Sequence, residues 1–175
     1  MPIVKGGGVR FLKPDVWFLD WSAEAVRHYK TDRKARFQNS SYYFRNGIAV
    51  PMVSSTRVTA SLMESRLFDQ SIVGLFPHDM RHLYYLLGFF NSSTCTTLLR
   101  AINPSANNSA NYIKKLPFVQ PQEDELTRVN EIVTRIMLEV RETGGYTESN
   151  LGLLDDTIKA IYEVAPSIVG SCQIL

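Results

Sequence analysis

The residues Pro77, His78 and Asp79 divide the chain into a part with strand-like patterns and a part with helical patterns. Before them, residues 57–62 alternate polar with small or apolar side chains, and residues 71–76 form a short apolar run. Both patterns are typical of strands. After them, apolar residues recur at three- and four-residue steps. This segregation predicts an α+β fold, in which a small twisted antiparallel or mixed sheet is followed by helices.

The first part contains further candidate strands. Residues 9–12 and 16–21 are rich in aromatic and branched side chains, which favour extended backbone. Residues 41–44 and 48–50 flank the Asn-Gly pair at 46–47, and Asn-Gly supplies the positive φ of a tight turn. We therefore expect a hairpin there.

Helix boundaries are marked in the second part of the chain. Asp79 can cap one helix, and Ser92 or Ser93 can cap a second one. The Asn-Pro pair at 103–104 then ends the second helix. Residues 105–112 are small and polar, and we expect an exposed loop.

The clearest local pattern is a long amphipathic helix from Gln122 that ends at the Gly-Gly pair at 144–145. A shorter helix is expected around residues 155–164. We thus predict a sheet-rich region over 1–121 and a helical segment over 122–175 that packs on it as one structural domain. One apolar stripe of the long helix contains Leu126, Val129, Ile132, Val133, Ile136, Met137 and Val140.

Charge is distributed unevenly along the chain. Residues 1–66 hold eleven Lys and Arg against five Asp and Glu, residues 67–116 four against two, and residues 117–175 four against ten. The balance is +6, +2 and −6, which sums to the +2 of the whole chain. This asymmetry indicates a basic front part that faces a polyanion and an acidic tail that faces elsewhere, although solvated faces without a partner are an alternative.

Export and membrane insertion are not expected. The longest apolar run, residues 83–90, is far shorter than the roughly 20 residues of a membrane span. Cys95 and Cys172 give neither a disulfide scaffold nor a zinc site, and we expect both to be ordinary buried thiols in a reducing compartment. We therefore expect a cytoplasmic protein with no membrane partner.

No pattern predicts a catalytic centre or a metal site in this chain. The Gly-Gly-Gly at 6–8 lacks the context of a phosphate or cofactor loop. Pro-Asp at 14–15 followed by Asp32 and Lys34 fits the permissive PD-(D/E)xK pattern, so a magnesium-dependent nuclease that uses Asp15 is one alternative. A protein-interaction module that uses the helix from Gln122 is another.

Three polar clusters suit nucleic acid instead. Lysines and arginines can bind phosphates, and amides and hydroxyls can reach base edges, where an arginine such as Arg57 can bind guanine in a bidentate way. We therefore predict a double-stranded DNA partner, with contacts from Lys30, Arg33, Lys34 and Arg36, from Ser54, Ser55, Thr56 and Arg57, and from Asn107, Asn108, Asn111, Lys114 and Lys115.

The second half of the chain resembles the target-recognition domain of adenine-N6 DNA methyltransferases. The resemblance rests on Arg-Leu-Phe-Asp-Gln at 66–70, on Leu-Tyr-Tyr-Leu-Leu-Gly-Phe-Phe-Asn-Ser at 83–92, and on the stretch from Asn-Pro-Ser at 103–105 to Ile-Lys-Lys-Leu-Pro-Phe at 113–118. It covers roughly residues 37–163. The family includes type IIG restriction-modification enzymes, the methylases of BREX-type phage defence and, more distantly, type I specificity subunits.

The resemblance implies a division of labour within a larger enzyme. The chain would read a short DNA sequence, while a separate methyltransferase domain, here expected upstream, would bind S-adenosylmethionine and methylate adenine, with or without a fused restriction endonuclease. The chain would itself be an excised C-terminal piece without a cofactor. The expected setting is the cytoplasm of a prokaryote.

Overall fold

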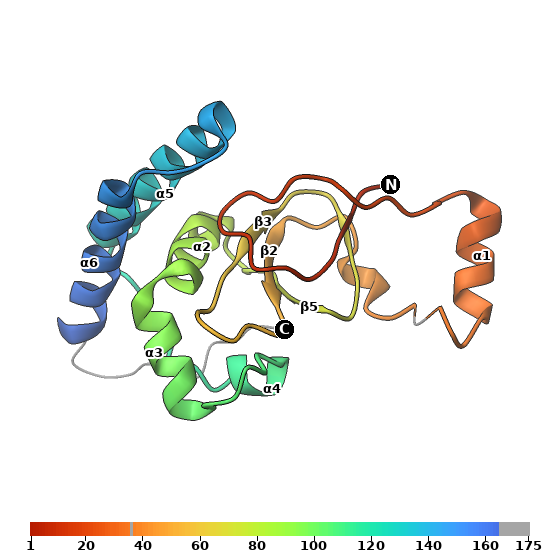
Figure 1. The fold of residues 1–175 in the computed structure, drawn as a ribbon, viewed down its shortest axis with the longest axis horizontal. Helices are drawn as coiled ribbons and strands as arrows, with labels where there is room; N and C mark the ends of the chain where they lie inside the picture. The colour runs from red at the N-terminus through yellow and green to blue at the C-terminus, as the bar shows by residue number, and fades with distance from the viewer. Residues whose placement is uncertain (36, 165–175) are drawn as a thin grey trace.

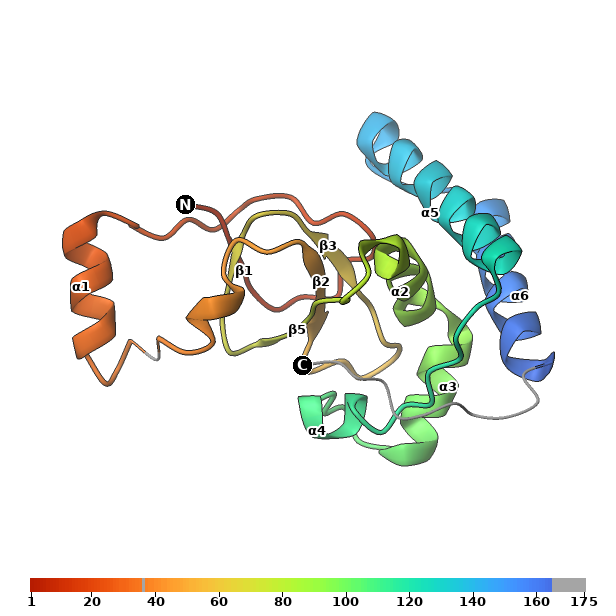
Figure 2. The ribbon, with the colours of Figure 1, turned by 180° about the vertical axis from the view of Figure 1, so that it is seen from behind.

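The computed structural model describes residues 1–35 and 37–164. The molecule is elongated, with a group of helices at one end, a small sheet in the middle and helix α1 at the other end (Figure 1), and the view from behind shows the same order (Figure 2). The α+β prediction is confirmed. In chain order the elements are β1 (Ile3–Val4), α1 (Ala23–Thr31), the 3-10 helix η1 (Ser40–Tyr42), β2 (Gly47–Pro51), β3 (Ser61–Met63), β4 (Leu67–Phe68), β5 (Ile72–Leu75), the 3-10 helix η2 (Met80–His82), α2 (Leu83–Asn91), α3 (Ser93–Ile102), α4 (Ala110–Ile113), α5 (Glu123–Thr143) and α6 (Glu148–Val164).

A three-stranded antiparallel sheet with the order β3-β2-β5 forms the centre of the molecule, and β1 pairs with β4 in parallel beside it. Every residue of β2 is buried, because the strand packs on both of its faces. Ile48 and Val50 join the large core shared with the helices. Ala49, which points the other way, joins a smaller core with Val4, Met63 and Ile72. The predicted strand over 71–76 is confirmed as β5, and the one over 57–62 is displaced to β3.

The predicted hairpin around Asn46-Gly47 is wrong. The segment expected as its first strand forms η1, and Gly47 is the first residue of β2 rather than a turn residue with positive φ. A Cβ at Gly47 would lie 2.5 Å from the Leu75 carbonyl oxygen and 2.7 Å from the Phe76 ring. The glycine is therefore needed for the close approach of β2 to β5, and not for a turn.

Residues 9–12 and 16–21 do not form the predicted strands, and Phe11 has a positive φ of 62°. Each segment makes an isolated bridge, Phe11 with Ser61 and Phe18 with Pro2. Phe11 donates its N–H to the Ala60 carbonyl at 2.8 Å, and its side chain is fully buried. These segments are thus attached by isolated bridges and a few backbone hydrogen bonds rather than by a continuous ladder.

Helix α1 is absent from the sequence-based prediction. Ser22 caps the helix by accepting the Ala25 N–H at 3.2 Å, and Glu24 lies in the first turn. No α1 residue is buried. The helix has no apolar stripe that could reveal it, since none of its side chains belongs to the core. The Ser22 cap was its main sequence signal.

The predicted boundaries of α2 and α3 are largely confirmed. The Asp79 carboxylate accepts the Arg81 N–H at 2.9 Å and caps η2, which leads directly into α2. Ser92 caps α3 by accepting the Cys95 N–H at 3.1 Å, and α3 ends at Asn103. The Cys95 thiol is fully buried, as expected, and burial raises its pKa. Cys172 lies outside the described residues.

Asn91, at the end of α2, joins the helices to the rest of the molecule. Its fully buried amide donates to the carbonyl oxygens of Ala60 at 2.8 Å and Leu87 at 2.9 Å, and its Oδ1 accepts the Ala60 N–H at 3.0 Å. The Arg10 guanidinium binds the Asn91 carbonyl oxygen and donates to the Tyr146 hydroxyl at 3.3 Å. Asn91 therefore binds both backbone polar groups of Ala60, next to β3, and shares the Ala60 carbonyl oxygen with the Phe11 N–H.

The long helix α5 begins and ends where the sequence predicts. Gln122 and Glu125 form a capping box, and Gly144 ends the helix with a φ of 76°. The first six residues of the predicted stripe are buried and Val140 is half-buried. The helix packs on α2 and on α6, which begins at Glu148 and is longer than expected. Among the described residues no helix is long and apolar enough to cross a membrane.

Candidate nucleic-acid interface

Two loops that are far apart in the sequence meet beside α3. Ser54 donates its N–H to the Ala106 carbonyl oxygen at 2.9 Å, and Asn108 donates its N–H to the Met52 carbonyl oxygen at 2.7 Å. Val53 and Asn107 form an isolated antiparallel bridge between these bonds. The second and third clusters predicted from sequence are therefore neighbours, and we call residues 52–57 together with residues 103–109 the paired loops.

Arg100, in the last turn of α3, fastens the paired loops to each other. Its guanidinium donates to the Ser54 carbonyl oxygen at 2.7 Å, to the Ser105 carbonyl oxygen at 3.0 Å and to Asn108 Oδ1 at 2.9 Å. One side chain thus binds both loops at three points. Sequence reasoning missed this residue, since a basic residue at a helix C-terminus has no pattern that identifies its partners.

The second of the paired loops is held by its own asparagines. Asn103 donates to the Asn107 carbonyl oxygen at 2.7 Å and accepts the Ser105 N–H at 3.2 Å, while Asn107 Oδ1 accepts the Ser109 N–H at 2.9 Å. Bonds of this kind are typical of polar turns, in which side chains replace secondary-structure partners of the backbone. The loop is consequently ordered before any ligand arrives.

The expectation of an exposed loop over 105–112 is wrong in two places. Asn108 is fully buried, with its amide donating to the Pro51 carbonyl oxygen at 3.2 Å, so its side chain is occupied within the protein. The short helix α4 occupies residues 110–113. Asn107 and Asn111 remain exposed. Asn108 therefore supports the loop from the protein interior and does not belong to the candidate surface.

The first of the paired loops presents its polar side chains outward. The Ser54 hydroxyl binds the Arg57 carbonyl oxygen and closes the turn, and Ser55 and Thr56 are exposed. The Arg57 guanidinium has no hydrogen bond or ion pair within the described part of the chain. Val53 is 73% exposed where the loops meet. Reasoning from charge and polarity overlooked this apolar side chain.

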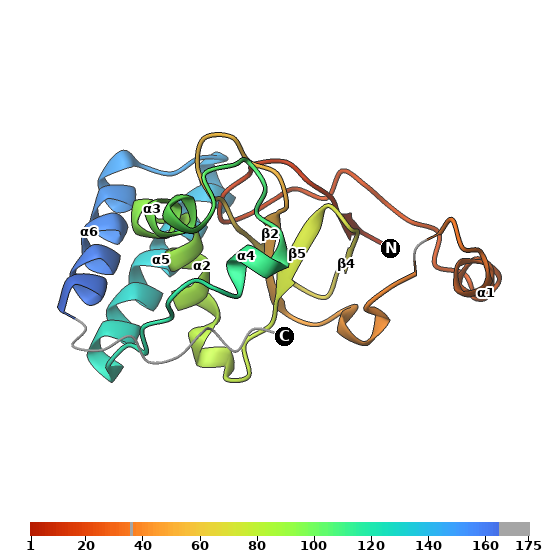
Figure 3. The same cartoon turned by 90° about the horizontal axis from the view of Figure 1, so that it is seen from below.

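Helix α4 places Lys114 and Lys115 beside the sheet, where Figure 3 shows it next to β5. Ile113 and Leu116 are buried on either side of the two lysines, which are both exposed. The Lys115 ammonium lies 6.0 Å from the centre of the Tyr112 ring. The apolar residues of the Ile-Lys-Lys-Leu motif are thus anchors, and the lysines face solvent.

The first predicted cluster lies on α1 and the turn that follows it. Lys30 is in the last turn of the helix, and Arg33 and Lys34 are in the turn, where the Asp32 carboxylate accepts the Lys34 N–H at 2.8 Å. All three cations are exposed. Arg36 lies outside the described residues. This cluster sits at the opposite end of the molecule from the helices (Figure 1).

A hollow connects the α1 cluster with α4. One cavity of about 490 Å³ lies between α1 and the sheet and includes Lys34, and a second of about 360 Å³ lies between η1, β5 and α4 and includes Lys114. The two cavities share the lining residues Gln38, Asn39, Phe68, Gln70 and Ile72. A surface bordered by cations at both of its ends therefore runs across the molecule.

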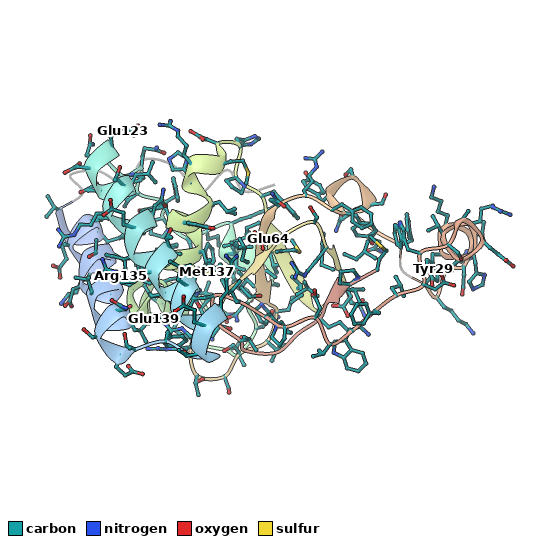
Figure 4. All side chains as sticks on the ribbon, turned by 90° about the horizontal axis from the view of Figure 1, so that it is seen from above. Tyr29, Glu64, Glu123, Arg135, Met137 and Glu139 are labelled. Carbon is teal, nitrogen blue, oxygen red and sulfur yellow. The ribbon has the colours of Figure 1, made fainter. Side chains whose placement is uncertain are left out.

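The acidic residues lie mainly at the other end. Figure 4 shows Glu123 and Glu139 on α5 among the helices, and Tyr29 on α1 at the opposite end. Arg81 is paired there with Glu123 at 3.1 Å and with Asp79 at 2.8 Å, and this pairing lowers the pKa of the Asp79 carboxyl. The charge asymmetry of the sequence is thus also an asymmetry in space, which suits a polyanion on one end only.

The contacts of its carboxylates give the nuclease alternative no support. Asp15 is held by Arg66 through two bonds of 2.6 and 2.9 Å, and this pairing raises the pKa of Arg66. Asp32 is bound within its own turn. In the described ranges no three His, Cys, Asp or Glu side chains gather in a way that would hold a metal ion.

Comparison with known proteins gives one significant similarity. No family model matches the chain. The chain is 27% identical over 137 residues to the adenine-specific methyltransferase PglX of Lacticaseibacillus casei (strain Zhang). The match covers 72% of this chain and 11% of that protein. The chain thus spans about a tenth of the length of the curated relative that it matches.

Proposed function

We propose that the chain recognises a short base sequence in duplex DNA as the target-recognition domain of an adenine-N6 DNA methyltransferase in a restriction-modification or phage-defence system. The observation that carries the proposal is the joining of the paired loops into one preformed polar surface beside Lys114 and Lys115. The similarity to an adenine-specific methyltransferase supports it independently.

The residues of the surface divide by the chemistry that they offer to DNA. Lys114 and Lys115, and the α1 cations Lys30, Arg33 and Lys34, suit phosphates, which fix position without reading sequence. Arg57, Ser55, Thr56, Asn107 and Asn111 carry the donors and acceptors that base edges recognise, and Val53 suits a thymine methyl group. Lys114 and Lys115 follow the second of the paired loops after helix α4, so both kinds of residue lie close together there, while the α1 cations lie toward the far end of the molecule (Figure 1).

The rest of the reaction would belong to other parts of a larger protein. A methyltransferase domain of the same polypeptide or complex would bind S-adenosylmethionine and receive the target adenine, flipped out of the duplex. The chain would hold the DNA against that domain. Its acidic helical end, where α5 and α6 lie, is the end that would not face phosphates.

The phosphate role predicts a change in salt dependence. The double substitution Lys114→Ala and Lys115→Ala should weaken binding to every duplex sequence and reduce the slope of log K against log salt by roughly 2, since each phosphate contact contributes about 0.9. Fluorescence anisotropy of a labelled duplex between about 50 and 200 mM salt measures both quantities. The matched control, Arg128→Ala with Arg135→Ala on the exposed face of α5, should leave the slope unchanged. An equal slope in the lysine variant and the wild type would remove the phosphate role.

The base-reading role predicts a different effect for Arg57. Its substitution with alanine should cost roughly 1 to 3 kcal/mol of discrimination at one base position, because a bidentate contact to guanine would be lost. Competition between the preferred duplex and duplexes changed at single positions measures this loss. A uniform loss of affinity at all positions would instead assign Arg57 to a phosphate.

A further inference from the structure

Trp17 and Phe18 expose large aromatic surfaces that nothing in the described chain covers. Their side chains are 54% and 70% exposed, and Val16 beside them is 61% exposed. Three consecutive exposed large apolar residues form a contiguous patch, which indicates a binding surface, whereas single exposed apolar residues are common and carry no such meaning. Their backbone is fixed, because Trp17 accepts the Ile3 N–H at 3.0 Å and Leu19 donates to the Met1 carbonyl oxygen at 2.8 Å. These rings are therefore held in place toward solvent.

Both rings line the 490 Å³ cavity between α1 and the sheet. Seven of its eighteen lining residues are aromatic, and charged and amide side chains make up much of the rest, a mixture that suits a flat, partly polar ligand. Trp21 and Phe37 stack at 6.0 Å, with Tyr43 against both, so three rings pack together in the wall. Burial there raises the pKa of the Tyr43 hydroxyl.

The charges around this cavity favour a nucleic acid over an apolar protein surface. The Lys5 ammonium lies 4.9 Å from the centre of the Trp17 ring, and Lys34 lines the same cavity, while the one carboxylate among the described lining residues, Asp69, is bound to the Ser71 N–H and hydroxyl. Aromatic rings interleaved with cations are the combination that binds unstacked bases together with their phosphates. Amide side chains of Gln38 and Asn39, at the boundary with the second cavity, are available to a base edge.

We propose that the cavity lined by Trp17 and Phe18 binds a single nucleobase that has left the DNA stack. The inference rests on the proposed function, because the cavity continues into the surface that ends at Lys114. It goes beyond that function, since it gives the chain a site for an unpaired base in addition to a surface for paired ones. Stacking on Trp17 would offset part of the cost of unstacking the base.

A duplex with one unpaired adenine tests the proposal directly. The wild-type chain should bind this duplex roughly tenfold more tightly than the fully paired duplex of the same sequence, as one stacking contact is sufficient for such a ratio. The two tryptophans of the chain, Trp17 and Trp21, both line the cavity, so the unpaired adenine should also quench the intrinsic fluorescence. The paired duplex should quench it much less.

Two substitutions separate stacking from simple apolar contact. Trp17→Leu keeps an apolar side chain but no ring, and it should abolish the preference for the unpaired adenine while binding of the paired duplex persists. Trp17→Phe keeps a ring and should retain the preference. Thermal unfolding of both variants verifies that they are folded.

Three results would overturn the inference. Equal affinity of the wild type for the two duplexes, without quenching, would assign the exposed rings to a protein partner and leave the proposed function intact. Retention of the preference in Trp17→Leu would show that the base lies elsewhere. Binding to neither duplex would overturn the proposed function as well.

Discussion

Replacing Asn91 with leucine should lower the free energy of unfolding by about 1 to 3 kcal/mol. Leucine has a similar size, so little cavity forms, but the Ala60 N–H loses its partner in the interior, while the Ala60 carbonyl oxygen keeps the Phe11 N–H as a donor. Each buried polar group without a partner costs about 1 to 3 kcal/mol. Urea denaturation followed by circular dichroism measures the change, which should appear in the midpoint rather than in the slope.

The same chemical change at an exposed asparagine is the control for this prediction. Asn111→Leu removes an amide from the surface of α4, where no buried backbone group depends on it. Its effect on unfolding should stay within about 0.5 kcal/mol. If Asn91→Leu were as mild as Asn111→Leu, the joint between α2 and Ala60 would not contribute to stability as the hydrogen bonds indicate.

Replacing Arg100 with alanine should loosen the paired loops, which would then be joined by their backbone bonds without the guanidinium. The Ser54 and Ser105 carbonyl oxygens and Asn108 Oδ1 lose their common donor, at a cost of roughly 1 to 3 kcal/mol in unfolding free energy. The change in amide exchange within the paired loops is a more specific test than the change in the free energy of unfolding. Amide exchange at Ser54 and Asn108, which bond across the loops, should accelerate by about tenfold or more, while exchange in α5 changes no more than global stability requires.

Arg100→Lys separates charge from geometry in this prediction. Lysine keeps the positive charge but lacks the planar fork that reaches three acceptors on two loops. It should therefore resemble alanine in amide exchange, and duplex binding should weaken in both variants. Unchanged exchange at Ser54 and Asn108 in the alanine variant would contradict the role of Arg100 as the fastener of the paired loops.

The sequence predicts the helical end of the molecule well because burial there follows a helical period. The apolar stripe of α5, its acidic first turn and Gly144 each mark the helix independently, and Ser92 marks the start of α3 in the same local way. In these elements the signal is carried by neighbouring residues. The prediction succeeds because no distant contact is needed to interpret it.

The errors occur where a distant contact decides the local structure. Gly47 looks like a turn residue, but Leu75 and Phe76 require its lack of a side chain inside β2. Asn108 looks like a surface amide until Arg100 and Pro51 are placed around it. Trp17 looks like a core residue of a strand and is instead half exposed. The partners of Gly47 and the Pro51 partner of Asn108 lie far away in the sequence.

The candidate site was predictable in composition but not in assembly. Polar and basic residues suited to DNA could be chosen from the sequence, yet nothing in it indicated that residues 54–57 and residue 107 are neighbours. Arg100, which brings them together, carried no recognisable signal. The resemblance to methyltransferase recognition domains gave a reason to expect one surface, and the backbone bonds between the loops show how the two loops form one.

Selection from a pool of duplexes with a randomised central segment tests sequence-specific recognition most directly. The wild-type chain is incubated with the pool at moderate salt, and bound duplexes are sequenced over successive rounds. We predict enrichment of one short sequence, with affinity for it about 10³-fold or more above that for random duplex, as is typical of specific recognition. A bound pool that stays random would contradict sequence-specific recognition by the paired loops.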